Sequence, residues 1–191
     1  MSSSTFFLPN PYQGTPFRWP AILNAWLPVV LFCCIFAIES TAPFGADHTS
    51  APLHTFFHAI FGSAVDSDWS EIHHIIRKSG HFTGYGTFSL ICFRGFWLTL
   101  RNRASRRPLG MKRLLTCHGL AMIVTFCVAS ADELHQSFLP NRTGVFSDVL
   151  LDSTGALALQ LILFLVLNAI ARRPKRPGTA AQPRKKMPLA A

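Results

Sequence analysis

The sequence predicts an all-α membrane protein, a four-helix transmembrane bundle with a short interfacial helix in its outer loop. Composition is the first reason: 49% of the 191 residues are hydrophobic and only 14% are charged, whereas an ordinary soluble domain has about 25% charged residues. The apolar residues are gathered into four long stretches, and most basic residues are separated from the acidic ones by these stretches. This clustering is typical of a membrane protein rather than a soluble one with a large core.

Four segments are long and apolar enough to cross a bilayer as helices, which takes about 20 residues each. They cover about residues 20–38, 81–100, 114–131 and 149–170. Helix is the expected form because lipid offers the backbone no hydrogen-bond partners. We interpret the first segment as a retained helix, since Arg18 is the only basic residue before it and it exceeds the usual apolar core of a signal peptide.

The charged residues predict the orientation. Fifteen of the 18 Lys and Arg residues lie on or near one side of the four segments, and all nine Asp and Glu residues lie on the other. Because Lys and Arg accumulate in cytoplasmic loops, we expect a protein of the cell membrane with both termini in the cytoplasm. The predicted parts are a cytoplasmic segment (1–19), a membrane domain (20–170) and a basic tail (171–191), disordered because it has few large apolar residues.

The net charge of +9 does not indicate a nucleic-acid partner. The basic residues flank membrane segments and lack interleaved aromatic residues, so contact with anionic inner-leaflet lipid accounts for them. The five cysteines lie in predicted spans without C-x-x-C spacing, which favours a packing role.

The long outer loop, residues 39–80, contains an amphipathic stretch. Residues 52–62 place Phe57 and Phe61 near one helical face and His54 and His58 on another, which predicts a short helix in the membrane interface. Two His residues four apart can bind metal. No carboxylate or Cys flanks them, however, so we interpret them as the polar face of this helix.

A polar cluster is predicted where the second, third and fourth spans reach the outer face. On the second helix, at its outer end, Lys78, His81 and Tyr85 share one helical face. Further acidic and polar residues end the third span and begin the fourth. The candidate ligand-binding residues are Lys78, His81, Tyr85, Asp132, Glu133, Gln136, Arg142, Asp148 and Asp152.

Two interpretations of this cluster compete. In the first, Lys78 and Arg142 only neutralise some of the acids, because charged groups near a membrane must pair or meet water. In the second, the cluster is a binding site, and the number of polar groups, larger than helix capping requires, favours this. Asp132, Glu133, His135 and His81 offer metal-binding atoms. We expect no bound metal and no cofactor, since Lys78 and Arg142 would already neutralise the acids.

Three stretches of the sequence resemble motifs of the VanZ-like family. Residues 77–85 (RKSGHFTGY) are similar to its R-K-x-x-H-F-x-x-Y motif, residues 132–142 (DELHQSFLPNR) to D-E-x-x-Q-x-F-x-P-x-R, and residues 148–156 (DVLLDSTGA) to D-V-x-x-N/D-x-x-G-A. Glu39 and Ser40 also fit, and the resemblance covers about residues 20–170. Gly84 departs from the pattern, because many relatives carry an acid there. The family is named after a glycopeptide-resistance accessory protein, so the resemblance implies a bacterial cell-envelope setting.

These observations predict an envelope protein whose outer-face site binds a lipid headgroup or a lipid-linked cell-wall intermediate, with a link to glycopeptide resistance. The alternative is a membrane-embedded hydrolase or transferase acting on a lipid. Nucleophilic catalysis needs a Ser, Thr or Cys beside a base, and neither nearby candidate, Ser79 or Ser137, has an obvious one. We therefore favour binding and assign no catalytic residue. A small transporter is disfavoured, because four helices leave little room for an inverted repeat.

Overall fold

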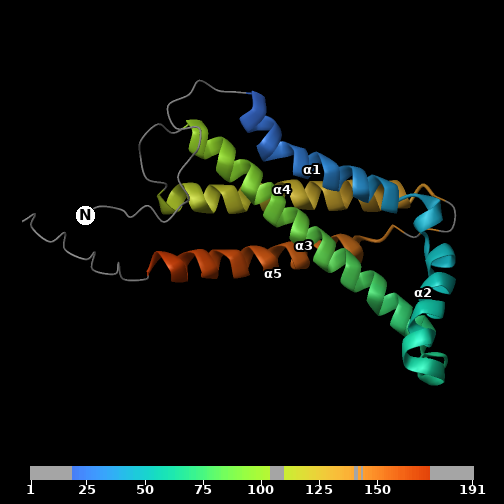
Figure 1. Ribbon diagram of the computed structural model, residues 1–191. Coiled ribbons are helices and arrows are strands. Elements are labelled where there is room, and N and C mark those ends of the chain that lie inside the picture. Colours follow the sequence, from blue (N-terminus) through green and yellow to red (C-terminus); the bar gives the residue numbers. More distant parts are fainter. Residues whose placement is uncertain (1–18, 104–109, 140–141, 143, 173–191) are drawn as a thin grey trace, which may run out of the picture.

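The computed structural model describes residues 19–103, 110–139, 142 and 144–172, and these residues are all-helical (Figure 1). The expected cytoplasmic N-terminal segment, apart from its last residue, and nearly all of the expected basic tail lie outside this part of the chain. The described elements are α1 (Trp19–Glu39), η1 (Ala42–Phe44), α2 (Ala46–Phe61), η2 (Gly62–Val65), α3 (Trp69–Arg103), α4 (Met111–Gln136) and α5 (Phe146–Ala171).

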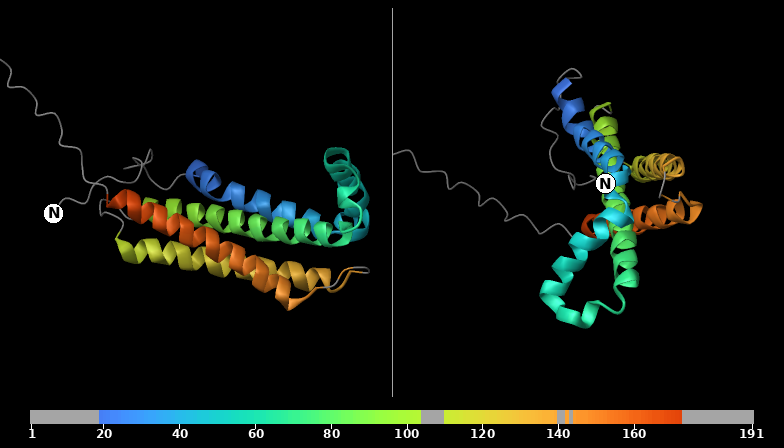
Figure 2. Two further views of the ribbon diagram at one scale, coloured as in Figure 1. Left: turned by 90° about the horizontal axis from the view of Figure 1, so that it is seen from below. Right: turned by 90° about the vertical axis from the view of Figure 1, so that its right-hand side faces the viewer.

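The long helix α3 is the centre of the bundle, because it packs against α1, α4 and α5 (Figure 2). The starts of α1 and α4 and the ends of α3 and α5 lie at one end of the molecule. Helix α2 lies across the other end, as does the connection from α4 to α5 (Figure 1).

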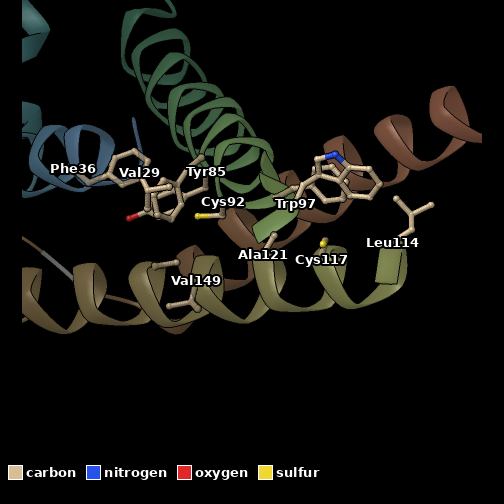
Figure 3. Packing of buried hydrophobic residues seen from close by; sticks show 12 residues of the cluster. Val29, Phe36, Tyr85, Cys92, Trp97, Leu114, Cys117, Ala121 and Val149 are labelled. Atoms are coloured by element: carbon tan, nitrogen blue, oxygen red, sulfur yellow. The ribbon is translucent and has the colours of Figure 1, made fainter. Parts of the chain in front are cut away.

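Aromatic and small side chains fill the space between these helices (Figure 3). Tyr85 and Cys92 of α3 are buried against Phe36 of α1 and Ala121 of α4 in one cluster. The rings of Phe36 and Tyr85 stack with their centroids 4.4 Å apart. Because lipid tails are as apolar as these side chains, close packing rather than exclusion of water holds membrane helices together.

Helices α3 and α5 approach each other most closely at two glycines. A Cβ atom at Gly155 would lie 2.2 Å from the carbonyl oxygen of Phe82, and one at Gly86 would lie 3.0 Å from the carbonyl oxygen of Gly155. Only residues without a side chain allow two helix backbones to come this near.

Three described helices, α1, α4 and α5, are long and apolar enough to cross a membrane. They contain the expected spans 20–38, 114–131 and 149–170. The expected span 81–100 lies within α3, which does not qualify, so the count of four spans is not confirmed. Polar residues such as His81 and Arg94 lower its hydropathy. His81 is partly buried between the helices, and the exposed Arg94 donates hydrogen bonds to the backbone and side-chain oxygens of Asn24 in α1.

The connection between α1 and α3, expected to be an outer loop, is more structured than its sequence predicts. Helix α2 begins at Ala46, six residues before the expected start, with Pro52 inside it. Two hydrogen bonds fasten it to α3: Trp69 Nε1 donates to Ser50 Oγ at 2.8 Å, and Thr49 Oγ1 lies 3.2 Å from His73 Nε2.

The expectation that no carboxylate accompanies His54 and His58 is wrong. Asp66 Oδ1 lies 3.0 Å from His54 Nε2 and 2.9 Å from His58 Nδ1. The turn η2 folds the chain back toward α2, so a residue distant in sequence becomes a neighbour. The hydrogen bond from His58 is the main cause of a lowered pKa at Asp66.

Candidate functional site

A cavity of about 320 Å³ lies between α1 and α3, at the end of the bundle that α2 crosses. Its apolar wall comes mainly from α1 and its polar wall from α3, α4 and the α4–α5 connection. Its lining residues include Phe32, Ile35, Phe36, Glu39, Ser40, Phe44, Leu53, Arg77, Gly80, His81, Gly84, Tyr85, Asp132, Gln136 and Arg142.

Helical spacing places the α3 residues of the cavity on one face. Arg77, His81 and Tyr85 are four residues apart in turn, so they lie one above the other. Gly80 and Gly84 lie on the same side, and a Cβ atom at Gly80 would meet nothing within 4 Å. These glycines leave part of the cavity open where larger residues would fill it.

Asp132, in the last turns of α4, is held by two donors. The hydroxyl of Tyr85 donates to its Oδ2 at 2.9 Å, and Gln136 Nε2 donates to the same oxygen at 3.2 Å. Tyr85 is 1% exposed, so this contact ties α3 to α4 at the edge of the core.

Arg142 fastens the α4–α5 connection to the end of α1. Its Nη2 donates to the carbonyl oxygens of Glu39 and Thr41, both at 2.9 Å, and its Nη1 donates to Gln136 Oε1 at 3.4 Å. The last carbonyls of a helix lack partners within it and carry partial negative charge, so a cation suits this position. Among the described residues, Arg142 forms no ion pair with an acidic side chain. The expectation that Arg142 neutralises one of the acids is therefore wrong.

Lys78 and Asp148 form a separate ion pair between α3 and α5. Both side chains are partly exposed, and neither lines the cavity. This pair connects the two helices near the end of the bundle that α2 crosses.

The remaining acids, Glu133 and Asp152, are buried where α3, α4 and α5 meet. Glu133 Oε2 accepts a hydrogen bond from the backbone N–H of Val145 at 3.0 Å. Asp152 Oδ1 lies 3.5 Å from His81 Nδ1.

The nine predicted residues thus separate into three groups. The cavity has His81, Tyr85, Asp132, Gln136 and Arg142; the ion pair has Lys78 and Asp148; the buried acids are Glu133 and Asp152, with His81 beside them.

Arg77 and Ser40 are two of the cavity residues that the sequence analysis did not include in the site. Arg77 precedes His81 by four residues, and this spacing alone could have placed it in the site. Burial, followed by the positive charge of Arg142, lowers the pKa of its guanidinium. Ser40 could not have been found in this way, because its partner is distant in sequence: its hydroxyl lies 2.9 Å from Nδ1 of His135.

The sequence matches the model of one protein family. The family model described as VanZ/LLP1 matches residues 23–167, which include every cavity residue named above. No curated protein and no solved structure matches the chain.

Proposed function

The chain belongs to the VanZ/LLP1 family, and on this premise we propose that its cavity binds the phosphate-bearing headgroup of a membrane lipid or of a lipid-linked cell-wall intermediate. The family and the three apolar helices identify a multi-pass membrane protein. We further propose a link to glycopeptide resistance, which would follow if the bound lipid is a cell-wall intermediate.

The observation that carries the proposal is a pair of arginines, Arg77 and Arg142, that both line the cavity. Arg77 Nη1 and Arg142 Nε are buried and have no hydrogen-bond partner among the described residues. Buried donors are almost always paired. A phosphate in the cavity would accept hydrogen bonds from these two guanidinium groups, which bind phosphate through directed hydrogen bonds.

The opposite wall suits the apolar part of a lipid. Phe32, Ile35 and Phe36 of α1 line the cavity, and nearby α1 residues such as Leu31 are exposed. A volume of about 320 Å³ is near the lower end of the 300–1,000 Å³ usual for small-molecule sites. It accommodates a headgroup with its first methylene groups, while the acyl or prenyl chain would lie along α1.

The proposal requires an orientation in which α3 is the fourth span and α2 lies at the outer interface. At about 1.5 Å per residue, the 35 residues of α3 measure about 52 Å, more than a bilayer core of about 30 Å. Its polar first turns would extend beyond the core on the outer side, beside α2.

Cysteine labelling tests this orientation. In a variant with the five native cysteines replaced by alanine, Ser67→Cys should react with a membrane-impermeant maleimide in intact cells. Gly110→Cys, at the opposite end of the bundle, should react only after permeabilisation, because a charged reagent does not cross the bilayer. Labelling of Gly110→Cys in intact cells would reverse the proposed orientation.

Lipid binding is tested on the full chain in mild detergent, with phosphatidylglycerol and a polyprenyl phosphate as separate probes in native mass spectrometry. Arg77→Gln should weaken binding of the preferred probe by about tenfold or more, as expected for one charge-assisted hydrogen bond. Arg172→Gln makes the same charge change at the other end of the bundle and should bind like the wild type. Whichever probe binds more tightly identifies the source of the headgroup.

A second pair of variants tests the cavity itself. Gly80→Leu adds a side chain at the cavity wall without a backbone clash and should weaken binding at least as much as Arg77→Gln. Gly119→Leu is the matched control, since a Cβ atom there likewise meets nothing within 4 Å and Gly119 does not line the cavity. Unchanged binding in both Arg77→Gln and Gly80→Leu would refute the proposal.

One contact favours a second candidate function, a membrane-embedded hydrolase or transferase. Ser40 is 3% exposed, lines the cavity and lies 2.9 Å from His135 Nδ1, the arrangement of a nucleophile beside a base. No described acid forms an ion pair with His135 that would orient its ring. If the protein only binds, Ser40→Ala retains lipid and the wild type leaves both probes intact. Cleavage of a probe by the wild type but not by Ser40→Ala would establish the enzyme.

A further inference from the structure

We propose that His81, Glu133 and Asp152 form a binding site for a divalent metal ion at the junction of α3, α4 and α5. The three side chains come from three different helices, and none of the lipid-binding arguments depends on them. This inference therefore stands independently of the proposed function.

The first support is the state of the buried polar atoms. Asp152 is 0% exposed and Glu133 is 5% exposed. Both carboxylate oxygens of Asp152, Oε1 of Glu133 and Nδ1 of His81 are buried without a hydrogen-bond partner among the described residues. Native proteins rarely leave such atoms unsatisfied, and an unpaired buried charge is especially costly. Four unsatisfied atoms in one place indicate a shared ligand.

The second support is their geometry. One ligand atom from each residue lies within 4.8 Å of the other two. The 3.5 Å between His81 Nδ1 and Asp152 Oδ1 is longer than an ordinary hydrogen bond. It is close to the separation of about 3.4 Å between two donor atoms on a tetrahedral zinc ion with bonds of about 2.0–2.2 Å.

The third support is the charge balance. Lys78 pairs with Asp148, and Arg142 contacts carbonyl oxygens, so neither forms an ion pair with Glu133 or Asp152. A protonated His81, 3.5 Å from Asp152, would neutralise one of the two buried acids, whereas a divalent ion would neutralise both. The expectation that no metal binds rested on Lys78 and Arg142 neutralising these acids, and the observed contacts remove that reason.

The donor set indicates the class of metal. One imidazole nitrogen and two carboxylate oxygens suit Zn²⁺ or Mn²⁺ better than the soft metals that prefer thiolates. The backbone N–H of Val145 already holds the second oxygen of Glu133 at 3.0 Å, the kind of outer contact that orients a ligand. His81 also lines the cavity, which offers the ion a way in.

A second cluster in the chain serves as the control. His54, His58 and Asp66 also bring three ligand atoms within 4.8 Å of one another. Asp66 already accepts from both imidazoles, and its side chain is 45% exposed. Adventitious metal would therefore bind at this exposed cluster, not at the buried one.

The test uses the full chain in detergent, washed with a chelator and titrated with Zn²⁺, Mn²⁺ and Co²⁺. Elemental analysis should find about one tightly bound ion per chain, and Co²⁺ should show the visible absorption of a low-symmetry site with nitrogen and oxygen ligands. Asp152→Asn and Glu133→Gln should each lower the affinity by about 100-fold or more, since outer-shell partners alone account for about 10–100-fold. His58→Ala should retain the ion.

The outcomes separate this site from the alternatives. A wild-type protein that binds no ion at micromolar metal overturns the proposal, as does an ion lost in His58→Ala but kept in Asp152→Asn. If Asp152→Asn or Glu133→Gln fails to fold, the Co²⁺ spectrum of His58→Ala decides the matter, because that variant removes a ligand of the exposed cluster and leaves the buried cluster intact. Arg77→Gln should keep the ion, so failure of lipid binding and failure of metal binding remain distinguishable.

Discussion

Gly155→Ala is expected to disrupt the packing of α5 on α3 and to destabilise the protein more than any other single change considered above. The added Cβ atom would lie 2.2 Å from the carbonyl oxygen of Phe82, 2.9 Å from its carbonyl carbon and 3.0 Å from its Cα. All three are backbone atoms of a helix, so no side chain can rotate away and the two helices must separate.

The expected loss exceeds the 1–3 kcal/mol of ordinary overpacking. Even a loss of about 3 kcal/mol, the upper end of that range, would lower the midpoint of thermal unfolding by about 6–12 °C for a chain of this size, and we expect a larger decrease, measured by circular dichroism in detergent. Gly119→Ala is the control: it meets no atom within 4 Å and should be neutral or gain up to about 1 kcal/mol from helix propensity. Equal midpoints for Gly155→Ala and the wild type would show that α3 and α5 are not packed this closely.

Arg142→Ala should produce the second large effect, by releasing the end of α1 from the α4–α5 connection. The substitution removes hydrogen bonds to the carbonyl oxygens of Glu39 and Thr41 and to Gln136. Hydrogen bonds from charged groups contribute about 1.5–3 kcal/mol each, and part of this is recovered where water reaches the freed carbonyls. We expect a net loss of about 3 kcal/mol in the free energy of unfolding.

Denaturation in a mixed detergent series measures this loss. Arg142→Lys keeps the charge but cannot reach all three acceptors with one ammonium group, so its stability should be intermediate. Arg172→Ala, an exposed arginine at the far end of α5, should unfold like the wild type. A stability of Arg142→Ala within error of wild type would mean that the end of α1 is held by other contacts.

This role of Arg142 decides which variant tests ligand binding. Loss of lipid binding in Arg142→Ala would follow from a displaced α1 as readily as from a lost phosphate contact. Arg77 has no side-chain hydrogen bond to another described residue, and its buried Nη1 is without a partner among them. Arg77→Gln therefore reports on the ligand with less effect on the fold.

The sequence by itself determined the helical class and three of the apolar spans. An apolar segment is recognised from its own residues, so the segments 20–38, 114–131 and 149–170 could be placed without knowledge of their neighbours. The helix around 81–100 was found but underestimated, because α3 continues back to Trp69 through polar residues that resemble a loop. These first turns pack beside α2 through Trp69 and His73, and that contact is a tertiary property.

The sequence also indicated that the polar groups of three motifs gather at one end of the bundle, because the spans bring their ends together. It could not assign partners. Lys78 contacts Asp148 across 70 positions of the chain, Ser40 meets His135 across 95, and Arg142 contacts carbonyl groups rather than an acid. Helical spacing determines which residues share a face, but not which face of the next helix they meet.

Tertiary packing made that decision here. The close approach of α3 and α5 at Gly86 and Gly155 sets the depth and rotation of the two helices relative to each other. At that register Asp148 reaches Lys78, and Asp152, one turn further on, is enclosed beside His81. Two acids four residues apart on one helix thus have different environments, one partly exposed in an ion pair and the other buried with Glu133.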